Sequence, residues 1–261
     1  MSSRTHVINH PGKSKYLLEC CVDSVESALE AAAGGADRLE LCSGLVIGGI
    51  TPSPALLSQI KDQLSIPVYP LIRPRFGDFL YTKQEIRLMC RDIRILKEYG
   101  ADGFVIGALR ADGSLDSSAL SVLSDACEGL PLTLHRAFDV CSDAFQALED
   151  AVALGFSTIL TSGQKNTCAE GIPLLKELCR SDKPIRIMAG AGVNATVIQL
   201  LLQETELTAF HMSGKKVISS GMQYRNKNVS MGAANLDEYA IWQTDRTEIQ
   251  KAKELLKLPR C

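Results

Sequence analysis

One pattern repeats along almost the whole chain and limits the folds open to it. A short apolar run rich in β-branched residues is followed by a polar turn and then by a longer stretch with helical spacing. Eight such runs occur, at residues 17–22, 38–42, 67–73, 103–107, 131–135, 158–161, 185–189 and 207–212. Their starts lie about 20 to 35 residues apart, which is the length of one strand, one crossover helix and two short loops. Eight such units close most simply into a (β/α)8 TIM barrel of the α/β class.

The stretches between these runs carry the signals of amphipathic helices. Within residues 82–99, four apolar residues from Ile86 to Leu96 recur at steps of three and four, which places them on one helix face. The main alternative is an open doubly wound sheet, whose first strand leads into Gly-x-Gly-x-x-Gly. The sequence at that point reads Cys21-Val22-Asp23-Ser24, so we favour the barrel.

The repeat defines a single domain over residues 16–261, with two segments outside the regular pattern. Residues 1–15 are mostly polar, and we expect them to form a flexible N-terminal tail. The residues after Gly214 form a C-terminal extension, which includes an expected helix at 247–258 but has no assigned place in the barrel.

Charge and composition exclude two classes of partner. The 28 Lys and Arg residues nearly balance the 30 Asp and Glu residues, and without a basic stripe we expect no nucleic-acid partner. No window approaches the roughly 18 apolar residues that cross a bilayer, so we expect no membrane role. The nine cysteines are odd in number and include no Cys-x-x-Cys pair, which is typical of free thiols in a reducing compartment. We therefore expect a cytoplasmic protein, with the nucleus as the alternative location.

The first two predicted strands end in the same motif, Glu-x-Cys. Glu19 and Cys21 share one face of the first strand, and Glu40 and Cys42 share the equivalent face of the second. Because parallel neighbours lie about 4.8 Å apart, the two sulfurs could reach one ion. Paired thiolates favour Cu(I) or Zn(II), whereas the glutamates would suit a harder cation. The alternative is that both cysteines are buried as small apolar residues.

Four ionisable residues at strand ends are predicted to line the barrel lumen: Glu19, Glu40, Arg73 and His135. Such groups cannot share a dry interior unless they pair or bind something. We therefore predict either a salt-bridge network or a catalytic site, in which His135 is a general acid or base oriented by Asp139. Alternatively, Asp139 caps the helix that follows it.

A glycine-rich rim follows the last two predicted strands. Gly190 and Gly192 come after the seventh strand and Ser213 after the eighth, where barrel enzymes bind phosphate groups through backbone N–H donors. With positive charge from Arg75, these residues form a candidate anion site, although glycines also occur at such turns for steric reasons alone. No Lys lies at a predicted strand end, so a Schiff-base aldolase is disfavoured.

Seven motifs occur in a fixed order between about residues 17 and 256. They are Glu19-x-Cys21-Val22-Asp23-Ser24, Gly34-Gly35-Ala36-Asp37-Arg38-Leu39-Glu40-Leu41-Cys42, Gly48-Gly49-Ile50-Thr51-Pro52-Ser53, Ile72-Arg73-Pro74-Arg75, Gly77-Asp78-Phe79, His135-Arg136-Ala137-Phe138-Asp139 and Leu160-Thr161-Ser162-Gly163. Together they resemble the CutC family of copper homeostasis proteins. The resemblance implies a (β/α)8 barrel, intracellular residence, copper handling and self-association into homo-oligomers. It also implies that Cys21 and Cys42 bind Cu(I), and it leaves the chemistry of the polar lumen open.

Two main functional hypotheses follow, and the sequence does not decide whether the protein is an enzyme. In the first, the protein serves copper homeostasis, and the copper ion is bound by Cys21 and Cys42 at the carboxyl ends of the first two strands. In the second, it is a barrel enzyme that acts on a small anionic or phosphorylated metabolite through its polar strand ends. A third reading, a barrel that serves only as an interaction scaffold, is disfavoured by the charged lumen.

Overall fold

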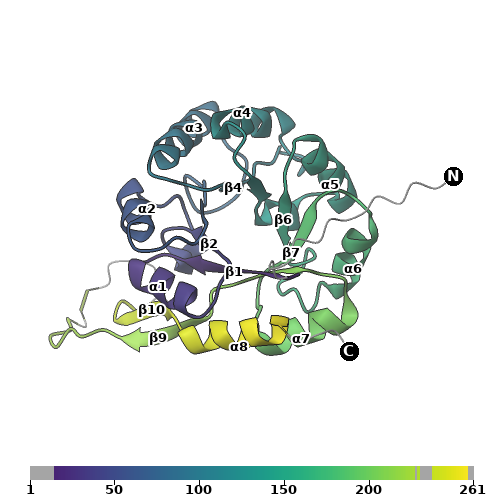
Figure 1. Ribbon diagram of the computed structural model, residues 1–261. Coiled ribbons are helices and arrows are strands. Elements are labelled where there is room, and N and C mark those ends of the chain that lie inside the picture. Colours follow the sequence, from purple (N-terminus) through teal and green to yellow (C-terminus); the bar gives the residue numbers. More distant parts are fainter. Residues whose placement is uncertain (1–14, 227, 230–236, 258–261) are drawn as a thin grey trace.

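The strands that the sequence predicts form a ring of parallel strands surrounded by helices (Figure 1). The computed structural model describes residues 15–226, 228–229 and 237–257. The ring strands are β1 (Leu17–Val22), β2 (Arg38–Leu41), β3 (Val68–Pro70), β4 (Phe104–Ile106), β5 (Leu132–Leu134), β6 (Thr158–Thr161), β7 (Arg186–Ala189) and β8 (Ala209–Met212). The sheet runs in the order β3-β2-β1-β8-β7-β6-β5-β4. The predicted TIM barrel is therefore confirmed.

The ring closes between β3 and β4 through a single bridge, the shortest of its strand pairings. Leu71, just after β3, forms a parallel bridge with Val105 of β4. The backbone N–H of Ile72 donates to the carbonyl of Val105 at 2.8 Å. By contrast, β1 and β2 are paired over four residue positions.

Helices connect the strands and cover the outside of the ring (Figure 1). They are α1 (Val25–Ala33), α2 (Pro54–Lys61), α3 (Lys83–Glu98), α4 (Ser117–Cys127), α5 (Ala144–Ala153), α6 (Ile172–Arg180), α7 (Ala195–Glu204) and α8 (Arg246–Lys257), with short 3-10 turns η1 (Leu45–Ile47) and η2 (Arg136–Val140). Helix α3 shows why these stretches are helical. Thr82 and Glu85 form a reciprocal capping box at its start. Met89, Ile93 and Leu96, which belong to the predicted apolar stripe, are buried.

The C-terminal extension completes the barrel. Strands β9 (Lys215–Ser219) and β10 (Ala240–Thr244) form an antiparallel pair, and the N–H of Thr244 donates to Ser27 Oγ of α1 at 3.1 Å. Helix α8 then packs between α7 and α1 and becomes the eighth helix of the ring (Figure 1). Gly34 permits this close approach, because a Cβ there would lie 2.6 Å from the Cβ of Ile249. The expected helix at 247–258 is thus present, one residue earlier than predicted.

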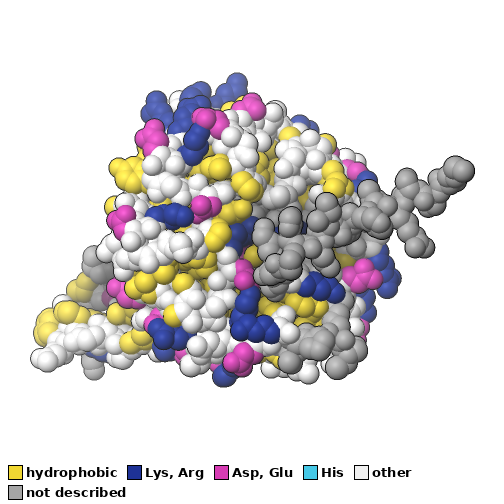
Figure 2. Space-filling model, viewed as in Figure 1, with side chains coloured by type: hydrophobic (Ala, Val, Ile, Leu, Met, Phe, Trp, Pro, Cys, Tyr) yellow, Lys and Arg dark blue, Asp and Glu magenta, His cyan; other side chains and the backbone are white. Residues whose placement is uncertain are grey.

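Several other expectations can be compared with the structure. The predicted tail at 1–15 lies, apart from Lys15, outside the described residues. The eight cysteines within the described part of the chain are all free thiols. Acidic side chains lie among the basic ones on the face shown in Figure 2, as the balanced composition suggested. In the described part of the chain, every helix is too short or too polar to cross a bilayer.

Candidate functional site

The two Glu-x-Cys motifs bring their sulfurs together at the carboxyl end of the ring. The parallel register pairs Cys21 of β1 with Glu40 of β2, and Cys42 follows directly after β2. The Sγ atoms of Cys21 and Cys42 lie 3.8 Å apart. Cys20 points to the outer layer, where its thiol donates to the carbonyl of Ser213 at 3.7 Å. The prediction that alternating residues place both sulfurs at a common point is confirmed.

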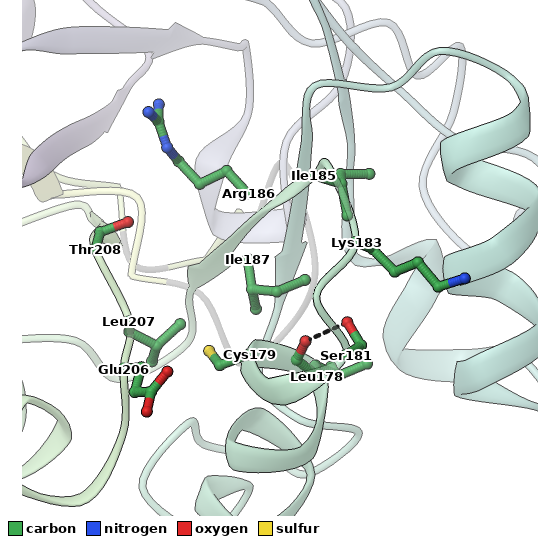
Figure 3. A pocket seen from close by; sticks show the side chains of 10 residues that line it. All are labelled: Leu178, Cys179, Ser181, Lys183, Ile185, Arg186, Ile187, Glu206, Leu207 and Thr208. Carbon is green, nitrogen blue, oxygen red and sulfur yellow. Dashed lines mark hydrogen bonds between the residues drawn. The ribbon is translucent and has the colours of Figure 1, made fainter. Parts of the chain in front are cut away.

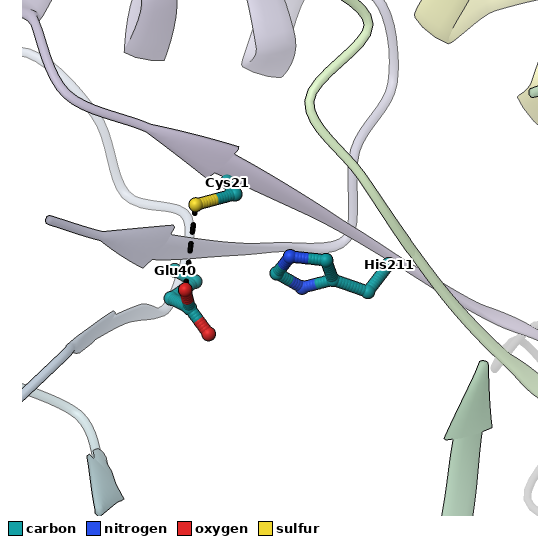
Figure 4. A group of neighbouring side chains, drawn as sticks. All are labelled: Cys21, Glu40 and His211. Carbon is teal, nitrogen blue, oxygen red and sulfur yellow. Dashed lines mark hydrogen bonds between the residues drawn. The ribbon is translucent and has the colours of Figure 1, made fainter. Parts of the chain in front are cut away.

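A histidine from the last strand joins this pair. Donor atoms of Cys21, Glu40 and His211 all lie within 4.8 Å of one another, and Figure 4 shows the three side chains converging. The Cys21 thiol also donates to Oε1 of Glu40 at 3.3 Å. Sequence reasoning gave no role to His211, because its place beside Cys21 depends on the pairing of β8 with β1.

Behind the sulfur pair, the carboxylate of Glu19 bonds the side chains of Arg38 and His211. This carboxylate forms a buried salt bridge with Arg38 through Oε2, and its Oε1 lies 2.8 Å from Nδ1 of His211. Burial would raise the pKa of Glu19, but the charges and hydrogen bonds of Arg38 and His211 outweigh it and lower the pKa. A salt-bridge network is therefore present at Glu19, but its partners are Arg38 and His211, whereas the sequence grouped Glu19 with Glu40, Arg73 and His135.

The surroundings raise the pKa of two groups in the cluster, the Cys21 thiol and the Glu40 carboxyl. The hydrogen bond to Cys42 and burial raise the pKa of the Cys21 thiol well above its usual value. Burial also raises the pKa of Glu40, whose Oε2 has no hydrogen-bond partner among the described residues. Burial would lower the pKa of His211, but the nearby carboxyl groups of Glu40 and Glu19 raise it.

A pocket of about 190 Å³ opens next to the cluster. Its lining residues come from strands β1, β2, β6 and β8 and from the loops after β2, β3 and β5: Cys21, Glu40, Leu45, Gly48, Leu71, Arg73, Phe79, His135, Arg136, Leu160 and His211. Most of the residues predicted to form the polar lumen therefore do meet around one space, together with an apolar wall. Cys42 lies just behind this surface and is fully buried.

Arg73, which follows β3 next to β2, and His135, which follows β5, complete the polar lining of the pocket. The Arg73 guanidinium donates to the carbonyls of Gly48, Gly49 and Gly77 at 2.8 to 3.2 Å. The Nδ1 atom of His135 accepts the N–H of Ala137 at 3.1 Å. Burial, assisted by the charge of Arg73, lowers the pKa of His135 to about 3, so its imidazole is neutral at neutral pH.

Asp139 has neither of the two contacts expected for it. Its carboxylate accepts hydrogen bonds from Arg136, from the Thr161 hydroxyl at 2.5 Å and from the Ser162 N–H at 2.9 Å. His135 instead bonds the backbone, and the cap of α5 is Asp143. Asp139 therefore ties η2 to the end of β6, because the 3-10 turn rotates it away from the histidine.

Three of the four residues of the expected anion site have other partners. Arg75 donates to Glu85 at 2.6 Å and to Asp78 at 2.8 Å, which uses its charge within the loop after β3. The N–H of Gly190 donates to the Thr161 carbonyl at 2.9 Å, and the Ser213 carbonyl accepts from Thr244. Although these residues and Gly192 are all described, none of the four lines the pocket beside Cys21.

A larger pocket lies at the opposite rim (Figure 3). It has a volume of about 340 Å³ and is lined by residues at the starts of β7 and β8, among them Arg186 and Thr208, and by the end of α6. The amino-terminal rim of such barrels serves stability, whereas chemistry takes place at the carboxyl ends of the strands. We therefore place the functional site at the pocket beside Cys21.

Comparisons with known proteins agree with this architecture. The sequence model of the CutC family matches residues 16–216. The human copper homeostasis protein cutC homolog is 46% identical over 244 residues, which cover 93% of this chain and 89% of the human protein. A CutC family protein of Pasteurella multocida is also 46% identical, over 90% of this chain and 97% of its own.

Solved structures extend the comparison. A CutC protein from Streptococcus agalactiae superimposes with a TM-score of 0.72 at 35% identity, covering 76% of this chain and 98% of its own. A thiamine phosphate pyrophosphorylase from Pyrococcus furiosus reaches a TM-score of 0.53 at 15% identity, over 94% of this chain and 96% of its own. The latter likeness shows the shared barrel fold alone.

Proposed function

The chain belongs to the CutC family, and on this premise we propose that it serves copper homeostasis by binding Cu(I) between Cys21 and Cys42. The observation that carries the proposal is the 3.8 Å separation of the two sulfurs, because Cys21 lines a pocket and Cys42 lies directly behind it. The human relative, which is named a copper homeostasis protein, supports the choice of metal. Two thiolates are soft ligands of the kind that Cu(I) prefers over hard divalent cations.

The separation of the sulfurs favours a bent site with a third donor. With metal–sulfur bonds of about 2.3 Å, the length found for zinc thiolates, a linear S–metal–S arrangement would require sulfurs about 4.6 Å apart. The observed 3.8 Å instead corresponds to an angle of about 110° at the same bond length. Such an angle leaves one side of the ion open to another ligand.

His211 is the best-placed third donor. Its Nδ1 is held by Glu19 at 2.8 Å, which leaves Nε2 for the ion. A carboxylate that binds the second ring nitrogen is the usual support for a metal-bound histidine, because it fixes the ring and raises the basicity of the ligating nitrogen. Glu40, whose Oε2 has no partner among the described residues, completes the donor set.

A Cu(I) titration of the reduced full chain tests the proposal. We would titrate Cu(I) without oxygen against a chromophoric chelator and compare the wild type with Cys21→Ser, Cys42→Ser and the double variant. Cys20→Ser is the matched control, because Cys20 is the adjacent residue of the same strand but faces the outer layer. One tightly bound ion is expected in the wild type and control, with at least a hundredfold loss in the double variant. Equal affinity in the double variant would overturn the proposal.

Two further expectations belong to the same proposal. Cu(I) and free thiols persist only under reducing conditions, so we assign the protein to the cytoplasm. The family resemblance also implies a homo-oligomer, which light scattering of the purified chain at two concentrations would detect.

A further inference from the structure

We propose that the pocket beside the sulfur pair binds a small organic carboxylate, which Arg73 and His135 hold. This inference goes beyond copper binding, because it assigns a second ligand to the lumen. It rests on two buried donor atoms that lack partners among the described residues, on the volume of the pocket and on the kind of surface that lines it.

The first group is the guanidinium of Arg73. The residue is only 8% exposed, and among the described residues no carboxylate oxygen lies within 4 Å of its nitrogens. Its terminal nitrogens bond three backbone carbonyls, while Nε has no hydrogen-bond partner in the described part of the chain. Burying a cation without a counter-ion costs free energy, so an anion that enters the pocket would offset the cost of burying Arg73.

The second group is the imidazole of His135, which is 4% exposed. Because Nδ1 accepts the N–H of Ala137, the proton of the neutral ring is on Nε2. That Nε2–H has no acceptor within the described residues. Both partnerless atoms, Arg73 Nε and His135 Nε2, are therefore donors, and the ligand that suits them must offer acceptor oxygens.

The walls of the pocket favour a carboxylate over a phosphate. Leu45, Leu71, Phe79 and Leu160 supply an apolar lining, which suits a ligand with a short hydrocarbon body. The volume of about 190 Å³ is below the roughly 300–1,000 Å³ typical of drug-sized ligands, so the ligand has few heavy atoms. Two donors match the two oxygens of a carboxylate, whereas barrel phosphate sites rely on the backbone N–H groups of a helix N-terminus.

The proposed carboxylate site and the metal site use different strands. Arg73 follows β3 and His135 follows β5, whereas Cys21, Glu40 and His211 belong to β1, β2 and β8. The two proposals can therefore fail independently. Carboxylate binding should persist in the Cys21→Ser, Cys42→Ser double variant, and Cu(I) binding should persist when His135 is changed.

The test uses n-butyrate as the probe and the reduced, metal-free full chain as the protein. n-Butanol has the same hydrocarbon body without charge, and inorganic phosphate has charge without the body. We would measure affinity by calorimetry and follow the ring nitrogens of His135 by NMR, with the His135→Phe variant providing the assignment. His135→Phe keeps a planar ring against Phe79 and removes only the donor, while Arg73→Lys keeps the charge and removes Nε–H.

The expected result is saturable binding of butyrate with a shift of the His135 Nε2 resonance, and at least a tenfold weaker response to butanol and phosphate. His135→Phe should weaken butyrate binding about tenfold. If Arg73→Lys fails to fold, the NMR shift in the wild type and the affinity of His135→Phe still test the carboxylate proposal. No saturable binding, an unshifted Nε2 resonance, an unchanged affinity in His135→Phe or tighter binding of phosphate would each overturn the proposal.

Discussion

Oε1 of Glu19 lies 2.8 Å from Nδ1 of His211, so a hydrogen bond between a buried carboxylate and a partly buried imidazole joins the first strand of the ring to the last. The same carboxylate bonds Arg38 on the other side. Glu19 therefore has two tasks: it compensates a buried guanidinium, and it orients the histidine that faces Cys21.

The first prediction concerns the removal of this charge. Glu19→Gln keeps the shape of the side chain but leaves Arg38 buried without a counter-charge, so the free energy of unfolding should fall by about 3–5 kcal/mol. Urea unfolding at neutral pH measures it. Glu248→Gln breaks a pair at the surface of α8 and should leave stability unchanged. Equal free energies of unfolding for the Glu19→Gln variant and the wild type would show that the ion pair of Glu19 with Arg38 does not stabilise the fold.

The second prediction concerns the third metal donor. His211→Phe retains an aromatic ring but removes Nε2, so Cu(I) affinity should fall by a factor of about 10–100 while the stoichiometry stays at one. The competition titration with a chromophoric chelator measures the change. His135→Phe is the matched control, since His135 lies outside the donor cluster and should leave Cu(I) affinity unaltered. An unchanged affinity in His211→Phe would mean that the sulfur pair acts without the histidine.

The third prediction uses the close approach at Gly107. A Cβ there would lie 2.4 Å from Cε1 and 2.5 Å from Nδ1 of His135, so Gly107→Ala must displace the ring. We expect a loss of about 1–3 kcal/mol in the free energy of unfolding together with loss of the butyrate response. Gly221→Ala is the control, because a Cβ there would meet nothing within 4 Å. A variant that binds butyrate normally would argue against the placement of His135 in the carboxylate site.

The fourth prediction concerns pH. The pKa of His135 is lowered from 6.5 to about 3 in the folded chain, so between these values the unfolded chain binds a proton that the folded chain excludes. The free energy of unfolding should therefore fall as the pH decreases, by about 2 kcal/mol at pH 5 from this group alone. Urea unfolding at pH 7.5 and 5.0 measures it, and His135→Phe should lose this part of the pH dependence. An equal pH dependence in both proteins would contradict the buried neutral imidazole.

Local sequence patterns predicted the features that depend on residues close together in the chain or on adjacent strands. The eight ring strands follow from apolar runs, and the meeting of Cys21 with Cys42 follows from alternation along two adjacent strands. The hairpin of β9 and β10 was not predicted, because its strands are largely exposed and are separated by a long connection rather than a tight turn. Exposed strands lack the buried apolar face that makes a pattern visible.

The contents of the site were harder to predict than its position. The hydrogen bond between Glu19 and His211 joins residues 192 positions apart and exists only because β8 pairs with β1. Arg75 was expected to bind an anion, but Glu85 from the capping box of α3 and Asp78 already bond it. Such competition between side chains is decided by loop geometry, which strand and helix periodicities do not encode.

The position of α8 determines how much of the C-terminal sequence a truncated form of this protein must keep. The segment that matches the family model ends at residue 216, whereas the helix between α7 and α1 begins at Arg246. A shortened gene product that stopped at the end of the match would lose the fully buried Ile249 and Ala252 and would uncover the apolar outer faces they protect. The cooperative unit of this barrel is therefore longer than its family signature, and recombinant fragments should retain the final helix.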